Sequence, residues 1–300
     1  MKAPTPRRFW PIVRRLAMAL IVFSLLLPAG LCVSFTRFGR QPVVPPRHPF
    51  PVAVQEIHIT ASDETLISGW YAPGQTGKTA FIFCHGVGAN RLQMLDPARF
   101  LVELGHPALL FDFRHHGESG GGFTSYGHYE KLDVLAMVGE LHRLTPGSPI
   151  VLWGLSMGAA TALLAAAESP QVAGVIAESP FDSLPATFAH HSRLFFNLPY
   201  YPLGWLTLHY IGWGYGFDPG SVSPIDAVRR LSRTAILFVS GKDDPRMPPD
   251  LVRTIAATHQ GPHWIFEGEG DHAMVFDKST VAYQEAVRRF LAHLEDSARP

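Results

Sequence analysis

The hydrophobic and polar positions divide the chain into an apolar N-terminal stretch and a longer region in which two patterns alternate. Short apolar runs bounded by glycine, proline or polar residues are typical of buried strands, and apolar residues three or four positions apart are typical of helices. The first pattern predicts a hairpin over 55–60 and 65–71, then strands over 79–84, 107–113, 150–153, 172–178, 234–240 and 263–266. The second predicts helices over 92–104, 129–144, 157–168, 251–258 and 280–294. This alternation implies an α/β fold, with a mostly parallel sheet and helices on both faces.

An uncharged run of 21 residues, 16–36, precedes this region. A helix of that length spans about 31 Å, close to the thickness of the bilayer core. Five basic residues precede the run and three follow it. The stronger positive flank predicts a cytoplasmic segment 1–15, a transmembrane anchor and an extracytoplasmic remainder of the chain. A cleaved signal peptide is the alternative, because Pro28-Ala29-Gly30 resembles the region before a cleavage site.

Composition narrows the possible classes of protein. Residues 37–54 contain five prolines and predict an extended spacer, which leaves one domain over 55–300. Hydrophobic residues make up 47% of the chain and charged residues 17%, which excludes global disorder. Residues 56–300 carry 17 basic and 25 acidic side chains, a net charge of −8, which disfavours nucleic acid as a partner. With only Cys32 and Cys84, a disulfide framework and a cysteine-based zinc site are excluded.

The pentapeptide Gly154-Leu155-Ser156-Met157-Gly158 lies between a predicted strand and an alanine-rich predicted helix. A nucleophilic serine on a strained strand-to-helix turn requires this context, since flanking glycines remove side chains that would collide with the strand and the helix. The interpretation without function is a glycine-rich turn. We expect Ser156 to be a nucleophile exposed at the carboxyl end of the sheet.

A second glycine-rich turn, 85–90, follows the strand predicted over 79–84. Such a turn exposes backbone N–H groups, and those of Val87 and Met157 are expected to converge on one substrate oxygen as an oxyanion hole. The alternative is a tight strand-to-helix connection. In either case we expect His85 to be a structural hydrogen-bonding residue.

Two later loops offer an acid and a base. Asp243 and Asp244 follow the strand predicted over 234–240, and a carboxylate there can reach a histidine on the next loop. The Gly-x-x-Asp pattern of that turn favours Asp244, while a solvated Asx turn is the alternative without function. His272 ends the glycine-rich loop 268–272 and would accept the Ser156 proton.

These residues, in the order Ser, Asp and His, resemble the α/β-hydrolase superfamily over roughly 55–295. The nearest resemblance is to membrane-anchored hydrolases similar to serine aminopeptidases and monoacylglycerol lipases. It also rests on segments 178–181 and 223–225, and on segment 112–119, which is similar to an Asp-x-Arg-x-His-Gly-x-Ser turn. The resemblance implies the α/β-hydrolase fold and a triad of Ser156, Asp244 and His272. The chain departs from the family pattern at Arg246-Met247-Pro248, which we do not expect to affect the triad.

Residues 181–230 break the alternation and are expected to form a short helical lid. Eleven aromatic residues lie within 181–217, where Asp182 is the only acid. Some of these rings must be ordinary core. Others are expected to line an apolar acyl pocket above the serine, and a further set to touch the membrane interface. The substrate-binding candidates are Phe181, Phe188, Phe195 and Trp205. The lid histidines His190, His191 and His209 are expected at its polar rim.

The sequence therefore predicts a serine hydrolase that forms an acyl-enzyme on esters of medium or long acyl chains, such as monoacylglycerols. No metal or organic cofactor is implied, and the adjacent His115 and His116 are not expected to form a metal pair. A peptidase acting on small or apolar amino-terminal residues is the main alternative. It is disfavoured because it needs an anionic subsite for the substrate amine, for which Asp182 is the only obvious lid candidate. A thioesterase fits an exported domain poorly. A non-catalytic binding protein is disfavoured because all three triad positions are filled, and a dinucleotide-binding domain because 85–90 lacks the third glycine. The sequence gives no indication of oligomeric state.

Overall fold

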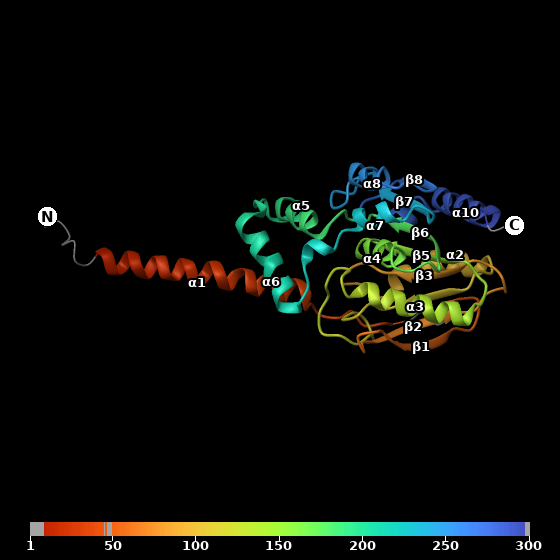
Figure 1. Cartoon of the computed structure of the whole chain (residues 1–300), viewed down its shortest axis with the longest axis horizontal. Helices are drawn as coiled ribbons and strands as arrows, with labels where there is room; N and C mark the ends of the chain where they lie inside the picture. The colour runs from red at the N-terminus through yellow and green to blue at the C-terminus, as the bar shows by residue number, and fades with distance from the viewer. Residues whose placement is uncertain (1–8, 45, 47–49, 298–300) are drawn as a thin grey trace.

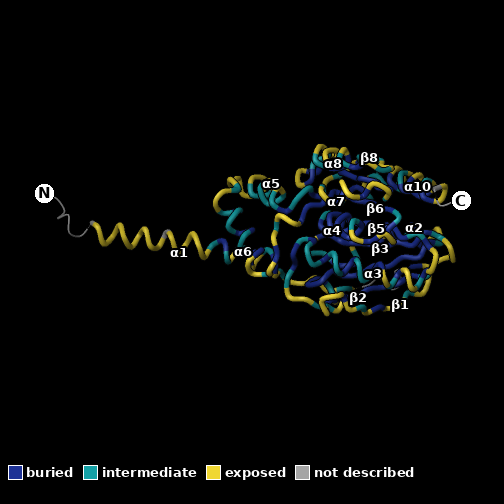
Figure 2. The backbone as a smooth tube through the Cα atoms, viewed as in Figure 1, coloured by how far each residue is buried: buried dark blue, intermediate teal, exposed yellow. Residues whose placement is uncertain are grey.

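The computed structural model describes residues 9–44, 46 and 50–297. A long N-terminal helix, α1 (Phe9–Thr36), projects from one end of a layered α/β domain (Figure 1). Among the described residues it is the one helix long and apolar enough to cross a membrane, over Trp10–Thr36. A membrane anchor and a signal sequence both fit this helix. Figure 2 shows that most of it is exposed and that only its last turns meet the domain.

Eight strands form one mixed sheet in the order β1-β2-β4-β3-β5-β6-β7-β8. Strands β1 and β2 pair antiparallel, β2 pairs antiparallel with β4, and all other neighbours are parallel. The prediction of a mostly parallel sheet is confirmed. The strands are β1 (Gln55–Thr60), β2 (Leu66–Ala72), β3 (Ala80–Cys84), β4 (Ala108–Phe111), β5 (Ile150–Leu155), β6 (Val172–Glu178), β7 (Ala235–Gly241) and β8 (His263–Gly268).

Helices cover both faces of the sheet, as predicted. Successive strand side chains point to opposite faces, so Phe81 and Phe83 lie in a different core from Ile82 and Cys84. One core contains buried residues of α3 (Glu130–Leu144), α4 (Met157–Ala166) and α8 (Pro249–Ala256). The other contains residues of α2 (Leu95–Glu103) and α10 (Thr280–Ser297). A short helix, α9 (Val275–Lys278), precedes α10.

Most predicted elements differ from the structure by one to three residues at an end, and two of the differences have an identifiable physical reason. The helix predicted over 92–104 begins with a 3-10 turn, η2 (Arg91–Met94), because the Asn90 side chain caps that turn by accepting from the Leu92 N–H. The strand predicted over 107–113 ends at Phe111. Asp112 leaves the sheet because its carboxylate is bound by the backbone N–H and the guanidinium of Arg91, at 2.7 and 2.6 Å.

The segment between β6 and β7 is helical and stands beyond the end of the sheet, beside the last turns of α1 (Figure 1). It contains α5 (Leu184–Phe196), η3 (Tyr200–Gly204), α6 (Trp205–Tyr215), η4 (Pro219–Ser221) and α7 (Pro224–Arg230). Ser183 caps α5 at its start, and α5 and α6 both end on a left-handed residue, Asn197 and Gly216. A third apolar cluster joins this segment to α4 and to Cys32 of α1. We call the segment the lid after its predicted role.

Candidate active site

Ser156 stands on a sharp turn between β5 and α4. Its φ of 55° and ψ of −117° lie in a region that non-glycine residues seldom occupy. Its backbone N–H donates to the Glu178 carbonyl of the neighbouring strand at 2.8 Å. Strain of this kind persists only where the surrounding structure enforces it. The turn therefore holds the candidate nucleophile at the carboxyl end of the sheet and at the N-terminus of α4.

Close backbone contacts explain the two glycines that flank this serine. A Cβ atom at Gly154 would lie 2.4 Å from the backbone of Gly158. A Cβ atom at Gly158 would lie 2.0 Å from the Cys84 carbonyl oxygen on β3. Both distances are far below van der Waals contact, so any side chain at these positions would push α4 away from the sheet. Glycine at both positions keeps the turn tight.

His272 lies in the loop after β8, and its ring bridges two of the predicted residues. Nε2 lies 2.9 Å from Ser156 Oγ, and Nδ1 lies 2.8 Å from Asp244 Oδ2. An ionised carboxylate only accepts hydrogen bonds, so Nδ1 carries the proton and Nε2 accepts from the serine hydroxyl. The structure thus brings Ser156, Asp244 and His272 together from three loops. Asp243, the other candidate acid, is exposed to solvent.

Asp244 is 2% exposed and its carboxylate accepts four hydrogen bonds. Oδ2 accepts from His272 and from the Ser179 hydroxyl, at 2.8 and 2.9 Å. Oδ1 accepts from the Arg246 and Met247 N–H groups, at 2.9 and 3.0 Å. Burial by itself would raise the pKa of Asp244, but the hydrogen bond and charge of His272 and the other donors lower it below its usual value. Asp244 is therefore ionised beside the imidazole.

Val87 follows β3 and lines the same cavity as Ser156 and Met157. The peptides on either side of it are held in place. The Gly86 N–H donates to a glutamine side chain at 2.7 Å, and the Gly88 N–H donates to a histidine ring nitrogen at 3.0 Å. These bonds fix the Val87 peptide near the start of α4. The role of the Val87 and Met157 N–H groups toward a substrate oxygen stays a prediction.

His85 and His116 hold this loop by hydrogen bonds to the backbone. The His85 ring bonds the Gly86 carbonyl at 2.7 Å and accepts from the Phe113 N–H at 3.0 Å. Complete burial, reinforced by the neighbouring His116, lowers the pKa of His85 to about 3, so this ring is neutral. Both ring nitrogens of His116 also bond backbone groups, at 2.8 and 3.0 Å, which leaves neither for a metal ion.

The turn 112–119 is closed by a charge cluster in which Arg91 and Asp112 are buried and Glu118 is exposed. The Arg91 guanidinium lies 2.6 Å from the Asp112 carboxylate and 2.7 Å from that of Glu118. Gly117 has a φ of +42°, and a Cβ atom there would lie 2.1 Å from Asp112 Oδ2. The acid and the glycine of the motif therefore serve the geometry of this turn, which supports the histidine beneath the Val87 loop.

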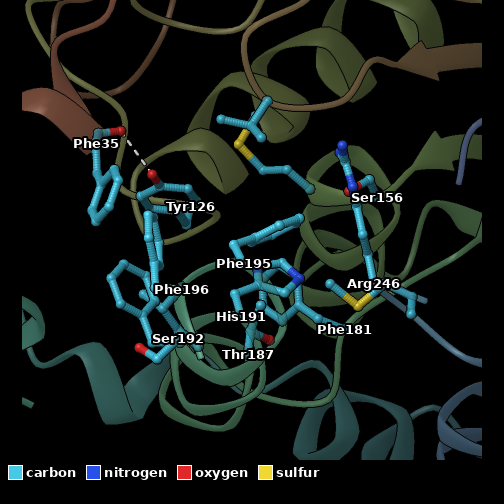
Figure 3. A pocket seen from close by; sticks show the side chains of 15 residues that line it. Phe35, Tyr126, Ser156, Phe181, Thr187, His191, Ser192, Phe195, Phe196 and Arg246 are labelled. Carbon is cyan, nitrogen blue, oxygen red and sulfur yellow. Dashed lines mark hydrogen bonds between the residues drawn. The ribbon is translucent and has the colours of Figure 1, made fainter. Parts of the chain in front are cut away.

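A cavity of about 290 Å³ lies between Ser156 and the lid (Figure 3). Three of the four predicted lid residues line it. Phe181 is buried after β6, Phe188 lies on α5, and Phe195 is 51% exposed with the Arg246 guanidinium 5.5 Å from its ring centroid. The fourth, Trp205, lines a different hollow along α6, where its ring centroid lies 4.0 Å from that of His209.

Nine further residues line the cavity beyond those proposed from the sequence, and three of them are Phe35, Tyr126 and His191. Phe35 belongs to α1. Its sequence is uniformly apolar there, so no pattern distinguishes a residue that lines a cavity. Tyr126 lies in a loop, and its hydroxyl donates to the Phe35 carbonyl at 2.7 Å. His191 was expected at the polar rim and instead faces the cavity. Burial, then the neighbouring His190, lowers the pKa of His191 to about 4, so its ring is neutral.

A second hollow of about 360 Å³ also reaches Ser156 and His272. Its lining is more polar and includes Gln93, Arg246 and Asp271. Ser156 therefore lies where an apolar cavity and a polar hollow meet.

Known proteins similar to this chain are found by sequence and by structure. The family model described as serine aminopeptidase, S33, matches residues 75–289. The uncharacterized protein YqkD of Bacillus subtilis is 34% identical over 236 residues, which cover 77% of each chain. Human monoglyceride lipase is 33% identical over 141 residues, 45% of this chain and 46% of its own.

The esterase Pf2001 of Pyrococcus furiosus superposes with a TM-score of 0.69 at 25% identity, over 87% of this chain and 99% of its own. The predicted α/β-hydrolase fold is thereby confirmed. The matched family segment contains the serine turn, the acid loop and the histidine loop, and it spans most of the chain. With that span and this fold, the chain belongs to the serine aminopeptidase S33 family of α/β hydrolases.

Proposed function

We propose that this protein is a serine esterase that cleaves carboxylic esters of lipid-like acyl chains, such as monoacylglycerols, through an acyl-enzyme. One observation carries the proposal: the hydrogen-bonded series Ser156–His272–Asp244 opens onto an apolar cavity. Two similar proteins, a monoglyceride lipase and an esterase, have names that agree with ester hydrolysis.

The geometry supports the following sequence of steps. Ser156 Oγ attacks the ester carbonyl while His272 Nε2 takes its proton, and ionised Asp244 stabilises the imidazolium that forms. The Val87 and Met157 N–H groups would hold the oxyanion of the tetrahedral intermediate. His272 then protonates the departing alcohol. Water, deprotonated by the same imidazole, finally releases the acid from the serine.

The two hollows at Ser156 assign an orientation to the substrate. The acyl chain would enter the apolar cavity of about 290 Å³, whose size is at the low end for ligand pockets and suits one chain. The alcohol would leave through the polar hollow beside Gln93 and Asp271. The hydroxyl groups of a glycerol could form hydrogen bonds with these polar side chains, whereas an acyl chain could form none.

Charges around the serine favour an ester over an N-terminal peptide. A peptidase that recognises a free amine needs a carboxylate near the nucleophile, and Asp182 was the lid candidate. Neither Asp nor Glu is among the described residues that line the apolar cavity on the acyl side, where the charged residue is Arg246. The acid Asp271 lines the polar hollow on the other side of the serine. The Asp182 carboxylate instead accepts from the Ser183 N–H at 2.6 Å.

The proposed location is a membrane. Residues 16–36 would remain as an anchor, with 1–15 cytoplasmic, and the hydrolase domain 55–300 with its lid 181–230 would lie outside the cytoplasm. An enzyme anchored in this way would lie next to the membrane, where lipid-like substrates are concentrated.

Hydrolysis of p-nitrophenyl esters from butyrate to palmitate tests the function, with wild type compared against Ser156→Ala. We expect a chain-length optimum in wild type and a fall in kcat of roughly 10⁶-fold in the variant. Equal turnover by both proteins would remove Ser156 as the nucleophile. A folded wild type that hydrolyses none of the esters but releases amino-terminal residues from peptides would favour the peptidase.

A further inference from the structure

The last ten residues of α1 pack against the hydrolase domain. Residues Trp10 to Leu26 of the helix are exposed wherever they are described, whereas the following stretch has one protected side (Figure 2). That side consists of buried and half-buried residues spaced as on one helix face: Leu27, Pro28, Leu31, Cys32, Phe35 and Thr36. It packs against α6 of the lid. The end of the anchor is therefore a fixed structural element of the domain.

Hydrogen bonds from two directions fix this end of the helix. On the lid side, Thr36 Oγ1 lies 2.7 Å from the Tyr215 hydroxyl of α6. On the side of the sheet, the Thr124 N–H donates to the Thr36 carbonyl at 2.9 Å, and the Tyr126 hydroxyl donates to the Phe35 carbonyl at 2.7 Å. Beyond the helix, Arg40 donates to two backbone carbonyls of the domain. Phe35 therefore has a defined position relative to the catalytic sheet.

The ring of Phe35 faces the apolar cavity. It packs edge-on against Phe188 with centroids 6.2 Å apart, and Phe188 packs in the same way against Tyr126 at 5.9 Å. All three rings line the cavity that reaches Ser156. Figure 3 shows Phe35 on the side of the cavity opposite Ser156. A group at that position meets the far end of an acyl chain and not the reacting carbonyl.

We propose that Phe35, a residue of the N-terminal membrane helix, is a wall of the acyl-binding cavity and sets the length of chain that fits. The proposal rests on the proposed esterase function. Under this proposal the N-terminal helix both anchors the protein and forms part of the substrate site. It also identifies a specificity-determining residue outside the segment 75–289 that matches the family model.

The test uses full-length protein in detergent micelles and two opposite substitutions. Phe35→Ala lengthens the cavity, and Phe35→Trp shortens it. We expect the optimum in kcat/KM to move to longer esters in the first and to shorter esters in the second. The ratio of dodecanoate to butyrate hydrolysis should change by roughly tenfold in each direction. Phe23→Ala is the matched control, because Phe23 lies on the same helix and is 60% exposed.

Three outcomes would overturn the proposal. They are an unchanged chain-length profile, a change by one factor at every chain length, and an equal shift in the Phe23→Ala control. An unchanged profile would mean that Phe35 does not contact the acyl chain. A uniform change would indicate a structural role only, and an equal shift in Phe23→Ala would indicate an effect of the micelle.

A second readout separates this proposal from the function on which it rests. Binding of dodecanoate to the Ser156→Ala protein needs no turnover. If wild type hydrolyses no ester, the esterase proposal fails, while a roughly tenfold change in dodecanoate Kd on adding Phe35→Trp still supports the cavity wall. An unchanged Kd in that double variant rejects the wall whether or not esters are cleaved.

Discussion

The end of the sheet around Ser156 and the lid above it are built in contrasting ways. At the sheet, Asp244 and Glu178 are almost completely buried, and hydrogen bonds hold both the serine turn and the acid loop. In the lid, Phe195 and Phe196 line the cavity and yet are 51% and 58% exposed. Positions on the sheet are thus fixed by the backbone, while positions on the lid depend on packing among aromatic rings. Under the proposed function, the reacting groups lie where hydrogen bonds fix the backbone, and the chain-length selectivity depends on the aromatic packing.

The largest expected effect concerns the hydrogen-bonded groups at the end of the sheet. In Asp244→Asn, the amide no longer supplies the charge that stabilises the imidazolium, and its NH₂ group favours the wrong tautomer of His272. We expect kcat to fall by roughly 10⁴-fold with little change in KM. Asp243→Asn is the control, since that side chain is exposed on the same turn, and steady-state kinetics on one ester compare the two. A greater loss in Asp243→Asn would reverse the assignment of the acid.

A second prediction concerns the stability of the same region. Glu178 lies beneath the serine turn, where Tyr283 donates to its carboxylate at 2.9 Å. Burial, opposed by that hydrogen bond, raises the pKa of Glu178 to about 7. The unfolded chain releases this proton near its ordinary pKa, so the folded state loses stability between about pH 4.5 and 7 and remains penalised above that range.

Glu178→Gln removes this penalty while it keeps an acceptor for Tyr283. We expect the variant to exceed wild type in unfolding free energy by up to about 3 kcal/mol at pH 8. The difference should be smallest at pH 4.5, and urea unfolding at several pH values measures it. Glu103→Gln, at an exposed position, should show no such trend. A Glu178→Gln difference that is independent of pH would mean that Glu178 is ionised in both states.

The same contrast explains how much could be predicted from the sequence. The serine turn could be predicted because its requirements are local: a buried strand, two glycines and a helix within a few residues. The mostly parallel sheet with helices on both faces follows from the alternation of strands and helices. Asp243 and Asp244 could not be separated with certainty, because both lie on one turn and only the tertiary contact with His272 distinguishes them.

The lid and the anchor were harder to predict for a physical reason. Nearly every position of α6 is apolar, so no periodicity shows which ring faces the cavity, and Trp205 was placed there although it lines another hollow. Phe35 lies within a run that is apolar throughout, as both a membrane anchor and a signal sequence would be. Composition therefore does not mark a cavity residue there, and only the packing of α1 on the lid distinguishes Phe35 from Phe23.

The smallest expected effect distinguishes lid aromatics that line the cavity from lid aromatics that are exposed to solvent. Phe188 and Trp213 are both lid aromatics, but Phe188 lines the cavity while Trp213 is 72% exposed. In Phe188→Ala, a long acyl chain loses contact with the ring, whereas a butyrate chain is too short to reach it. We expect kcat/KM for dodecanoate to fall by roughly tenfold and that for butyrate to stay within about twofold. In Trp213→Ala, both values should stay within about twofold, because an exposed ring contributes little to a buried site. A similar loss in the two variants, measured side by side in the same micelles, would mean that lid aromatics act through the surface of the lid and not through the cavity.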